Sequence, residues 1–181
     1  MLGLLAILAL SNSGGNSCRC PGSSCCANRE LPTFLPARGT MESTEELVEA
    51  IGALTDEGFG GDSFTVTAPL NVLTNPKNIV PVSEGLQITR DGIYEISYNM
   101  DVRFDQVGED VAAYVQLNGT ADLFALTGTH WTADGAFQPA VNTARITFGA
   151  DDELRLAVSV FVTPGTLTIA PGAKLTVRRV G

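Results

Sequence analysis

The stretch GIYEISYNMDVRF, residues 92–104, alternates apolar and polar side chains along its whole length. Its apolar side chains fall on every second position: Tyr94, Ile96, Tyr98, Met100, Val102 and Phe104. Successive side chains of a strand point to opposite faces, so these residues share one face. On a helix, the same spacing would scatter them around the axis. The stretch therefore predicts a long strand with one buried face, packed against a second layer.

Shorter apolar segments on both sides of this stretch are separated by turn-forming residues. They are residues 64–66, 70–73, 79–82, 86–88, 111–117, 123–127, 144–148, 154–162, 167–169 and 175–177. Many of the 19 Gly and 9 Pro lie between these segments, and Asn118-Gly119 is a strong tight-turn signal. Turn spacings of about 8–12 residues without intervening helices predict an all-β jelly-roll sandwich of about eight to ten antiparallel strands.

The segment STEELVEAIGAL, residues 43–54, departs from this strand pattern. Ser43 and Glu46 match a capping box, and apolar residues follow at helical spacing. The segment predicts one short helix, which is either a neck in a multimer or packing beneath the body. We therefore divide the chain into an N-terminal attachment arm (1–40), a short helix or neck (41–61) and a jelly-roll head (62–181).

Residues 1–10, MLGLLAILAL, are apolar throughout. As a helix they would span about 15 Å, which is too short for a hydrocarbon core of about 30 Å, so we expect no membrane span. Two interpretations stay open. The segment is either part of a cleaved secretion signal, although no basic residue precedes it and no A-x-A site follows, or an apolar anchor that docks on another subunit.

All four cysteines lie in the arm, at Cys18, Cys20, Cys25 and Cys26. Such clustering cannot connect distant parts of a core, and C-x-C followed by C-C fits the usual spacing of zinc ligands poorly. Neighbouring Cys25 and Cys26 do not readily bond each other without strain. We expect interchain disulfides that link subunits on an oxidising cell exterior, with a local knot or free thiols as the alternative.

The composition excludes some partners. A net charge of −9 argues against binding nucleic acid or anionic membranes, which both require clustered Lys and Arg. The single histidine, His130, lies beside the single tryptophan, Trp131, and no nucleophile or phosphate-binding motif appears. We therefore expect no enzyme activity and no catalytic residue.

Calcium is the one cofactor that the sequence leaves open. Carboxylates in predicted turns offer oxygen ligands: Asp105, Glu109, Asp110, Asp151 and Asp152. Their spacing matches no EF-hand loop, which favours solvated turn charges and no cofactor. Asn118-Gly119-Thr120 is also a glycosylation sequon, but its role as a turn explains it without a sugar.

Several motifs together carry a resemblance to a known family. GIYEISY (92–98) resembles the G-x-Y-x-F-x-Y strand of the complement C1q and tumour-necrosis-factor-like superfamily, with Ile96 in place of the aromatic residue. The flanking segments are similar to the C-terminal domain of BclA-type spore-surface glycoproteins. They are LQITRDGIYEISY (86–98), AAYVQLNGT (112–120), ITFGADDELRLAV (146–158) and AKLTVRRVG (173–181).

The resemblance implies a ten-strand jelly roll that forms a homotrimer, with Tyr94, Ile96 and Tyr98 as core or trimer residues. BclA-type proteins also have a Gly-X-Y stalk, which this chain lacks. Its arm instead resembles the Cys-bearing connectors of endospore appendage subunits. We expect a structural subunit of a bacterial spore- or cell-surface filament or layer, at the exosporium, joined to anchor proteins through the arm. The alternative is a receptor- or glycan-binding module, such as an adhesin or phage fibre tip.

Overall fold

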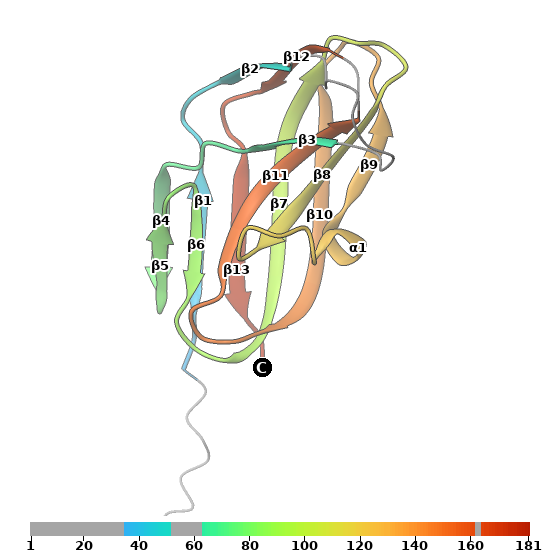
Figure 1. Ribbon diagram of the computed structural model, residues 1–181. Helices are drawn as coiled ribbons and strands as arrows, with labels where there is room; N and C mark the ends of the chain where they lie inside the picture. The colour runs from blue at the N-terminus through green and yellow to red at the C-terminus, as the bar shows by residue number, and fades with distance from the viewer. Residues whose placement is uncertain (1–34, 52–62, 162–163) are drawn as a thin grey trace, which may run out of the picture. The chain divides into compact units, whose positions relative to one another are not determined.

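Two antiparallel sheets pack face to face in the computed structural model, which describes residues 35–51, 63–161 and 164–181 (Figure 1). The apolar segment 1–10 and the four cysteines lie outside the described residues. The first strands are β1 Arg38–Glu42, β2 Leu47–Ile51, β3 Ser63–Thr67, β4 Val72–Lys77, β5 Ile79–Val82, β6 Gly85–Ile88 and β7 Gly92–Phe104. The other elements are β8 Asp110–Leu117, α1 Phe124–Thr127, β9 Thr129–Thr132, β10 Gln138–Phe148, β11 Glu153–Phe161, β12 Gly165–Ile169 and β13 Lys174–Arg179.

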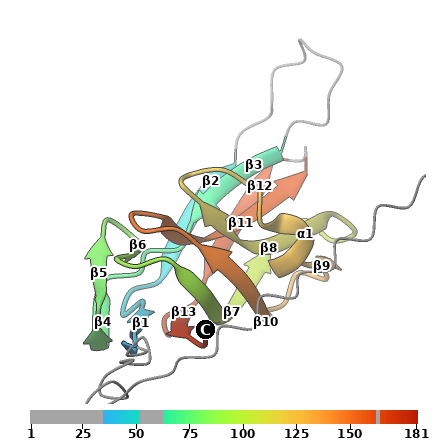
Figure 2. The same ribbon diagram turned by 90° about the horizontal axis from the view of Figure 1, so that it is seen from below.

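The first sheet has seven strands in the order β2-β12-β7-β13-β1-β4, with β10 paired to the other edge of β7. The second has six strands in the order β5-β6-β11-β8-β9, with β3 paired to β11. In Figure 2, β1, β13, β7 and β10 line up as one layer, and β6, β11 and β8 form the other. The predicted all-β jelly-roll sandwich is confirmed.

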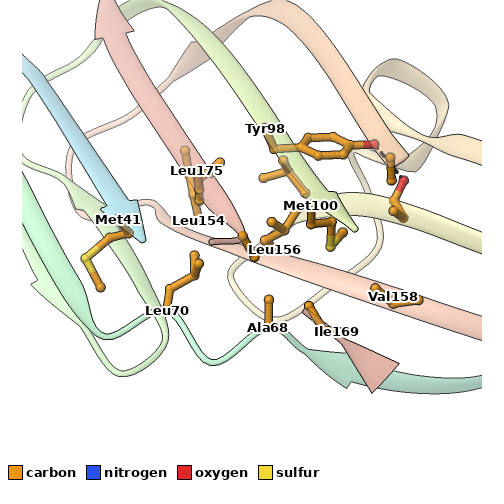
Figure 3. Close-up of a cluster of buried hydrophobic side chains, with 14 of the residues drawn as sticks. Met41, Ala68, Leu70, Tyr98, Met100, Leu154, Leu156, Val158, Ile169 and Leu175 are labelled. Carbon is orange, nitrogen blue, oxygen red and sulfur yellow. Dashed lines mark hydrogen bonds between the residues drawn. The ribbon is translucent and has the colours of Figure 1, made fainter. Parts of the chain in front are cut away.

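The core lies between the two sheets, and the alternation of β7 decides which of its residues enter it. The side chains of Tyr94, Ile96 and Tyr98 are 0%, 1% and 5% exposed. Figure 3 shows Tyr98 and Leu175 of the seven-stranded sheet facing β11 residues such as Leu156. Burial of apolar surface on both sheets is the main stabilising term for such a sandwich.

The helix predicted over residues 43–54 is wrong in the part that the structure describes. Residues 47–51 form β2, and all five pair with β12, from Leu47 opposite Ile169 to Ile51 opposite Gly165. The Ser43 hydroxyl bonds Glu45 locally, so it caps no helix. Helix propensity is a weak preference, and pairing with a strand distant in sequence overrides it here.

The short helix lies elsewhere, at α1, where we predicted strand for residues 123–127. The Thr127 hydroxyl donates to the Leu123 carbonyl at 2.9 Å and accepts from the Val115 N–H at 2.9 Å. These two bonds close a single helical turn against β8. A tertiary contact of this kind leaves no signal in the local sequence.

The head begins earlier than the predicted boundary at residue 62. β1 is an interior strand of the seven-stranded sheet, paired with β13 on one side and β4 on the other. Met41 is buried in the core. Residues assigned to the arm and neck are therefore part of the sandwich.

The turn predicted at Asn118-Gly119 is confirmed. Asn118 has φ 52° and Gly119 has φ 79°, and Leu117 bridges to Thr120. Positive φ at both central positions is the conformation that Asn-Gly pairs favour. No helix within the described ranges is long and apolar enough to cross a membrane.

Candidate functional site: the outer face of the seven-stranded sheet

The polar side chains of β7 lie on the outer face of the seven-stranded sheet. The residues that pair with them on the neighbouring strands complete this face. A row of hydroxyl groups crosses five strands: Thr74, Thr40, Thr176, Ser97 and Thr143. The Thr40 and Thr176 hydroxyl oxygens lie 3.1 Å apart. We call this set the hydroxyl row.

A row of charged groups lies next to the hydroxyl row on the same strands. It consists of Lys77, Arg38, Arg178, Glu95 and Arg145. We call this set the charged row. Glu95 accepts from Arg178 at 2.7 Å and from Arg145 at 3.2 Å. The hydrogen bonds from Arg145 and then Arg178 hold the pKa of Glu95 below its ordinary value.

The whole face is cationic, although the chain carries a net charge of −9. Its basic residues in the described part of the chain are Arg38, Lys77, Arg103, Arg145, Lys174 and Arg178. Its acidic residues there are Glu42, Glu95 and Asp101. Lys174 pairs with Glu42 at 3.3 Å. The excess of cations makes this face attractive to anionic surfaces.

Large apolar side chains are also exposed on this face. Val141 on β10 and Val48 on β2 are each 58% exposed, and Ile93 on β7 is 46% exposed. The Arg103 guanidinium lies over the Phe137 ring, 5.1 Å from its centroid. Apolar groups among polar ones are what a protein–protein contact requires.

Two hollows indent this face. The larger, about 320 Å³, lies over β1 and is lined by Arg38, Thr40, Asn75, Thr176 and Arg178 together with the backbone around Gly39 and Val177. We call it the β1 groove. The smaller, about 150 Å³, shares Thr176 and reaches Ser97, Asn99 and Lys174.

The predicted core or trimer residues Tyr94, Ile96 and Tyr98 point away from this face, into the core. The Tyr98 hydroxyl lies 2.9 Å from the Ala113 carbonyl and 2.8 Å from both the Thr127 carbonyl and the Thr129 hydroxyl. Burial raises the pKa of Tyr98, and the Thr129 hydrogen bond partly offsets this. The alternate residues of β7, from Glu95 to Arg103, are the ones that face outward.

His130 and Trp131 lie on β9, at the edge of the six-stranded sheet. His130 Nε2 is 3.7 Å from Asp110 Oδ1, and both side chains are about half exposed. Among the described residues, no hydroxyl or thiol group is hydrogen-bonded to His130.

Two of the turn carboxylates, Asp105 and Asp152, are hydrogen-bonded to backbone and side-chain groups of the protein. The Thr166 N–H donates to Asp105 at 2.8 Å and lowers the pKa of that carboxyl. Asp152 accepts from the Gly149 N–H at 2.8 Å and from the Asn118 amide at 3.1 Å. Within residues 35–51, 63–161 and 164–181, no three His, Cys, Asp or Glu side chains gather as metal ligands.

A third hollow, about 210 Å³, lies on the six-stranded sheet beside α1 and is lined by Tyr114, Phe124 and Ser159 among others. The Thr65 and Ser159 hydroxyls lie 2.7 Å apart, and the Tyr114 hydroxyl lies 3.0 Å from Ser159. The Phe124 ring packs edge-on against Tyr114, with centroids 5.2 Å apart.

Sequence reasoning identified only part of this face. The alternation of residues 92–104 exposes Glu95, Ser97 and Asn99 on one side of a strand. The partners in each row come from β1, β4, β10 and β13, and nothing local in the sequence gives their register. The rows and the β1 groove were therefore missed.

Comparison with known proteins supports the fold. No protein-family model matches the chain, and no curated protein matches it. A solved structure of Eiger TNF from S. frugiperda aligns with a TM-score of 0.52 at 9% identity, over 81% of this chain and 94% of that one. Murine APRIL at pH 8.0 aligns with a TM-score of 0.47 at 12% identity, over 80% and 99%. The described part of this chain therefore has a TNF-like jelly-roll fold.

Proposed function

We propose that this protein is a non-enzymatic structural subunit whose jelly-roll head forms a homotrimer on a bacterial spore or cell surface. The main support for the proposal is the composition of the outer face of the seven-stranded sheet. It combines exposed apolar groups, the hydroxyl row and an excess of cations on an otherwise acidic protein. The resemblance of residues 86–98 and the three later segments to BclA-type heads supports the placement at a spore surface.

Charge separation supports contact between copies of this chain. Outside the outer face, the described residues carry three basic side chains, at Arg90, Arg155 and Arg179. Acidic side chains there are far more numerous: Glu45, Glu46, Glu49, Glu84, Asp91, Asp105, Glu109, Asp110, Asp122, Asp134, Asp151, Asp152 and Glu153. A cationic face on one copy is thus complementary to an acidic surface on the next. Such a heterologous contact closes into a ring when its rotation fits.

The arm is the proposed attachment device. Residues 1–10 would dock on anchor proteins, and Cys18, Cys20, Cys25 and Cys26 would form disulfides between chains. Separate roles for the arm and the head account for the placement of all four cysteines in the arm and none in residues 62–181. Disulfides persist outside the cell, where a spore-surface layer lies.

The mass of the full chain under reducing conditions tests the trimer. Light scattering after size exclusion should give three times the 19.0 kDa of one chain at micromolar concentration. The reductant keeps the cysteines from contributing to the assembly. A monomer mass would refute the trimer.

A matched pair of valine substitutions tests whether the outer face makes the contact. Val141, on β10, is 58% exposed on this face, and Val107, 72% exposed, lies in the turn after β7 and on none of the strands of this face. Val141→Arg should reduce the mass to that of a monomer by adding a charge and bulk to a buried contact. Val107→Arg should remain trimeric. If both variants remain trimeric, the interface lies elsewhere.

Gels without reductant test the covalent part. Assembled full-length protein should show a ladder of disulfide-linked species. The ladder should disappear when all four cysteines are replaced by Ser, while the mass in solution stays trimeric. Absence of a ladder from assembled protein would remove cross-linking from the proposal.

A receptor- or glycan-binding module is the second candidate function. The β1 groove favours it, because a hollow of about 320 Å³ lined by hydrogen-bonding side chains can hold a small ligand. A glycan array probed with the full chain separates the candidates. Reproducible binding that depends on groove residues would favour the binding module.

A further inference from the structure

The charged row places three cations side by side in direct register. Arg38 on β1 lies opposite Lys77 on β4 and, on its other side, opposite Arg178 on β13. Directly opposed residues of antiparallel strands have their Cβ atoms about 5 Å apart, and like charges at that distance destabilise the sheet. The repulsion among these three cations destabilises the sheet locally unless an anion lies close to them.

Few carboxylates in the described part of the protein lie close enough to neutralise these cations. Glu95 is the single acidic residue of the charged row within the described strands, and it is bonded to Arg178 and Arg145. Neither Arg38 nor Lys77 has an ion pair with a described carboxylate, and both are exposed. Four cations thus share one carboxylate, and the excess is concentrated at Arg38.

The backbone opens the surface at the same point. Two steps along β1, from Arg38 to Thr40, oppose three steps along β4, from Lys77 to Thr74, so the register shifts by one residue. Asn75 occupies this bulge with φ 50°, a conformation that Asn tolerates better than most residues. The bulge borders the β1 groove, and Asn75 is one of its lining residues.

The lining of the β1 groove suits an anion. Guanidinium groups come from Arg38 and Arg178, hydroxyl groups from Thr40 and Thr176, and an amide from Asn75. None of the described residues that line it is acidic. Guanidinium groups offer several N–H donors in a fixed plane, which bind phosphate or sulfate oxygens through two parallel hydrogen bonds.

We propose that the β1 groove is a binding site for a phosphate or sulfate group, with Arg38 as its principal ligand. The volume of about 320 Å³ exceeds the needs of one inorganic anion and admits the sugar of a monoester. Free inorganic anions and phosphorylated or sulfated sugars share the chemistry that the groove recognises. The proposal goes beyond the trimeric head and does not require it, and β7 and β13 separate β1 from β10, where the contact at Val141 is proposed.

Thermal unfolding of the full chain under reductant tests the site. Unfolding is followed in sodium sulfate, in sodium phosphate and in sodium chloride, all at equal ionic strength. Chloride controls for general screening of the charged row. Binding to the folded state should raise the midpoint in sulfate and phosphate by about 2–4 °C over chloride. An equal midpoint in all three salts would refute the site.

Replacing Arg38 by Gln gives a result that a structural role would not produce. Because the substitution removes a repelled cation, R38Q should be at least as stable as the unaltered chain in chloride. Its midpoint should rise less in sulfate than that of the unaltered chain, because only the general stabilisation by excluded sulfate remains. A purely structural arginine would instead lower the midpoint equally in every salt. Arg38→Lys keeps the charge and should retain part of the response. Arg90→Gln, an exposed arginine in the turn before β7, should leave the response intact.

The source of the anion is resolved by titrating inorganic phosphate, glucose 6-phosphate and glucose separately. A half-saturating concentration at least tenfold lower for glucose 6-phosphate than for phosphate assigns the groove to sugar monoesters. Equal values assign it to the free anion. A response to glucose alone that R38Q retains would overturn the proposal. Light scattering on the same samples distinguishes failure of the anion site from failure of the trimer. A monomer whose unfolding midpoint responds to the anion would refute only the trimer.

Discussion

Replacing Tyr98 by Phe removes one buried hydroxyl group and keeps the ring that fills the core. That hydroxyl is the only side-chain group of β7 that reaches β8, α1 and β9 together in the described part of the chain, through Ala113, Thr127 and Thr129. Each hydroxyl group donates a single proton, so Tyr98 serves one of its acceptors at a time, and the Thr129 hydroxyl also reaches the Val141 carbonyl at 3.1 Å. The substitution leaves buried polar atoms without this partner.

The expected loss of stability follows from the number of buried polar atoms that lose a hydrogen-bond partner. Leaving a buried donor or acceptor unsatisfied costs about 1–3 kcal/mol, and we expect about 2 kcal/mol for Tyr98→Phe. With a urea dependence of about 2 kcal/mol per molar, the midpoint of unfolding should fall by about 1 M. Trp131, the single tryptophan, lies on β9 and reports the transition by fluorescence. The protomer concentration must be held constant, because assembly changes apparent stability.

Tyr114→Phe is the matched control. The Tyr114 hydroxyl lies 3.0 Å from Ser159, but Ser159 and Thr65 also bond each other at 2.7 Å and keep a partner without it. We therefore expect a smaller loss, about half that of Tyr98→Phe. Thr129→Val should cost less stability in the Tyr98→Phe background than in the unaltered chain, since the bond between the two hydroxyl groups is already lost and only the bond to the Val141 carbonyl remains to be removed. Equal urea midpoints for the unaltered chain and Tyr98→Phe would refute the role of this network.

Two further substitutions test the strand that organises the fold. Ile96→Asp buries an unpaired charge at a position that is 1% exposed, at a cost on the order of several kcal/mol. The variant should lack a cooperative thermal transition, and melting like the unaltered chain would mean that the inward face is misassigned. Glu95→Gln should lower the midpoint at pH 7 by removing the anion between Arg145 and Arg178. The folded-state pKa of Glu95 is below its ordinary value of 4.5. Ionised Glu95 therefore stabilises the folded state at pH values above 4.5, and this stabilisation is lost as the pH falls through the lowered pKa. The two midpoints should therefore converge in acid, and a constant difference would contradict the ion pairs.

The interior of the fold was predictable where the signal is local. The period of two in residues 92–104 depends only on the pleat of a strand, and it correctly assigned Tyr94, Ile96 and Tyr98 to a buried face. The Asn118-Gly119 turn was predictable for the same reason, because positive φ is a property of those residues themselves.

Segments whose structure depends on distant partners were not predictable. Residues 47–51 have a helical pattern, yet they pair with β12, more than a hundred residues later. The capping signals of Ser43 and Glu46 favour a helix only while no strand competes for the same backbone groups. The early strand β1 escaped notice because Met41 is its one apolar side chain and its other buried position is Gly39, so its five residues show no apolar alternation.

The chain by itself determined a two-faced strand, an all-β class, an acidic head and an arm that holds every cysteine. Only the tertiary structure decided what the polar side of that strand becomes. Arg38, Lys77 and Arg178 are far apart in sequence, and the antiparallel register places them in adjacent positions. The bulge at Asn75 lies beside them and lines the β1 groove. Register arises from pairing across the sheet, which no local pattern encodes.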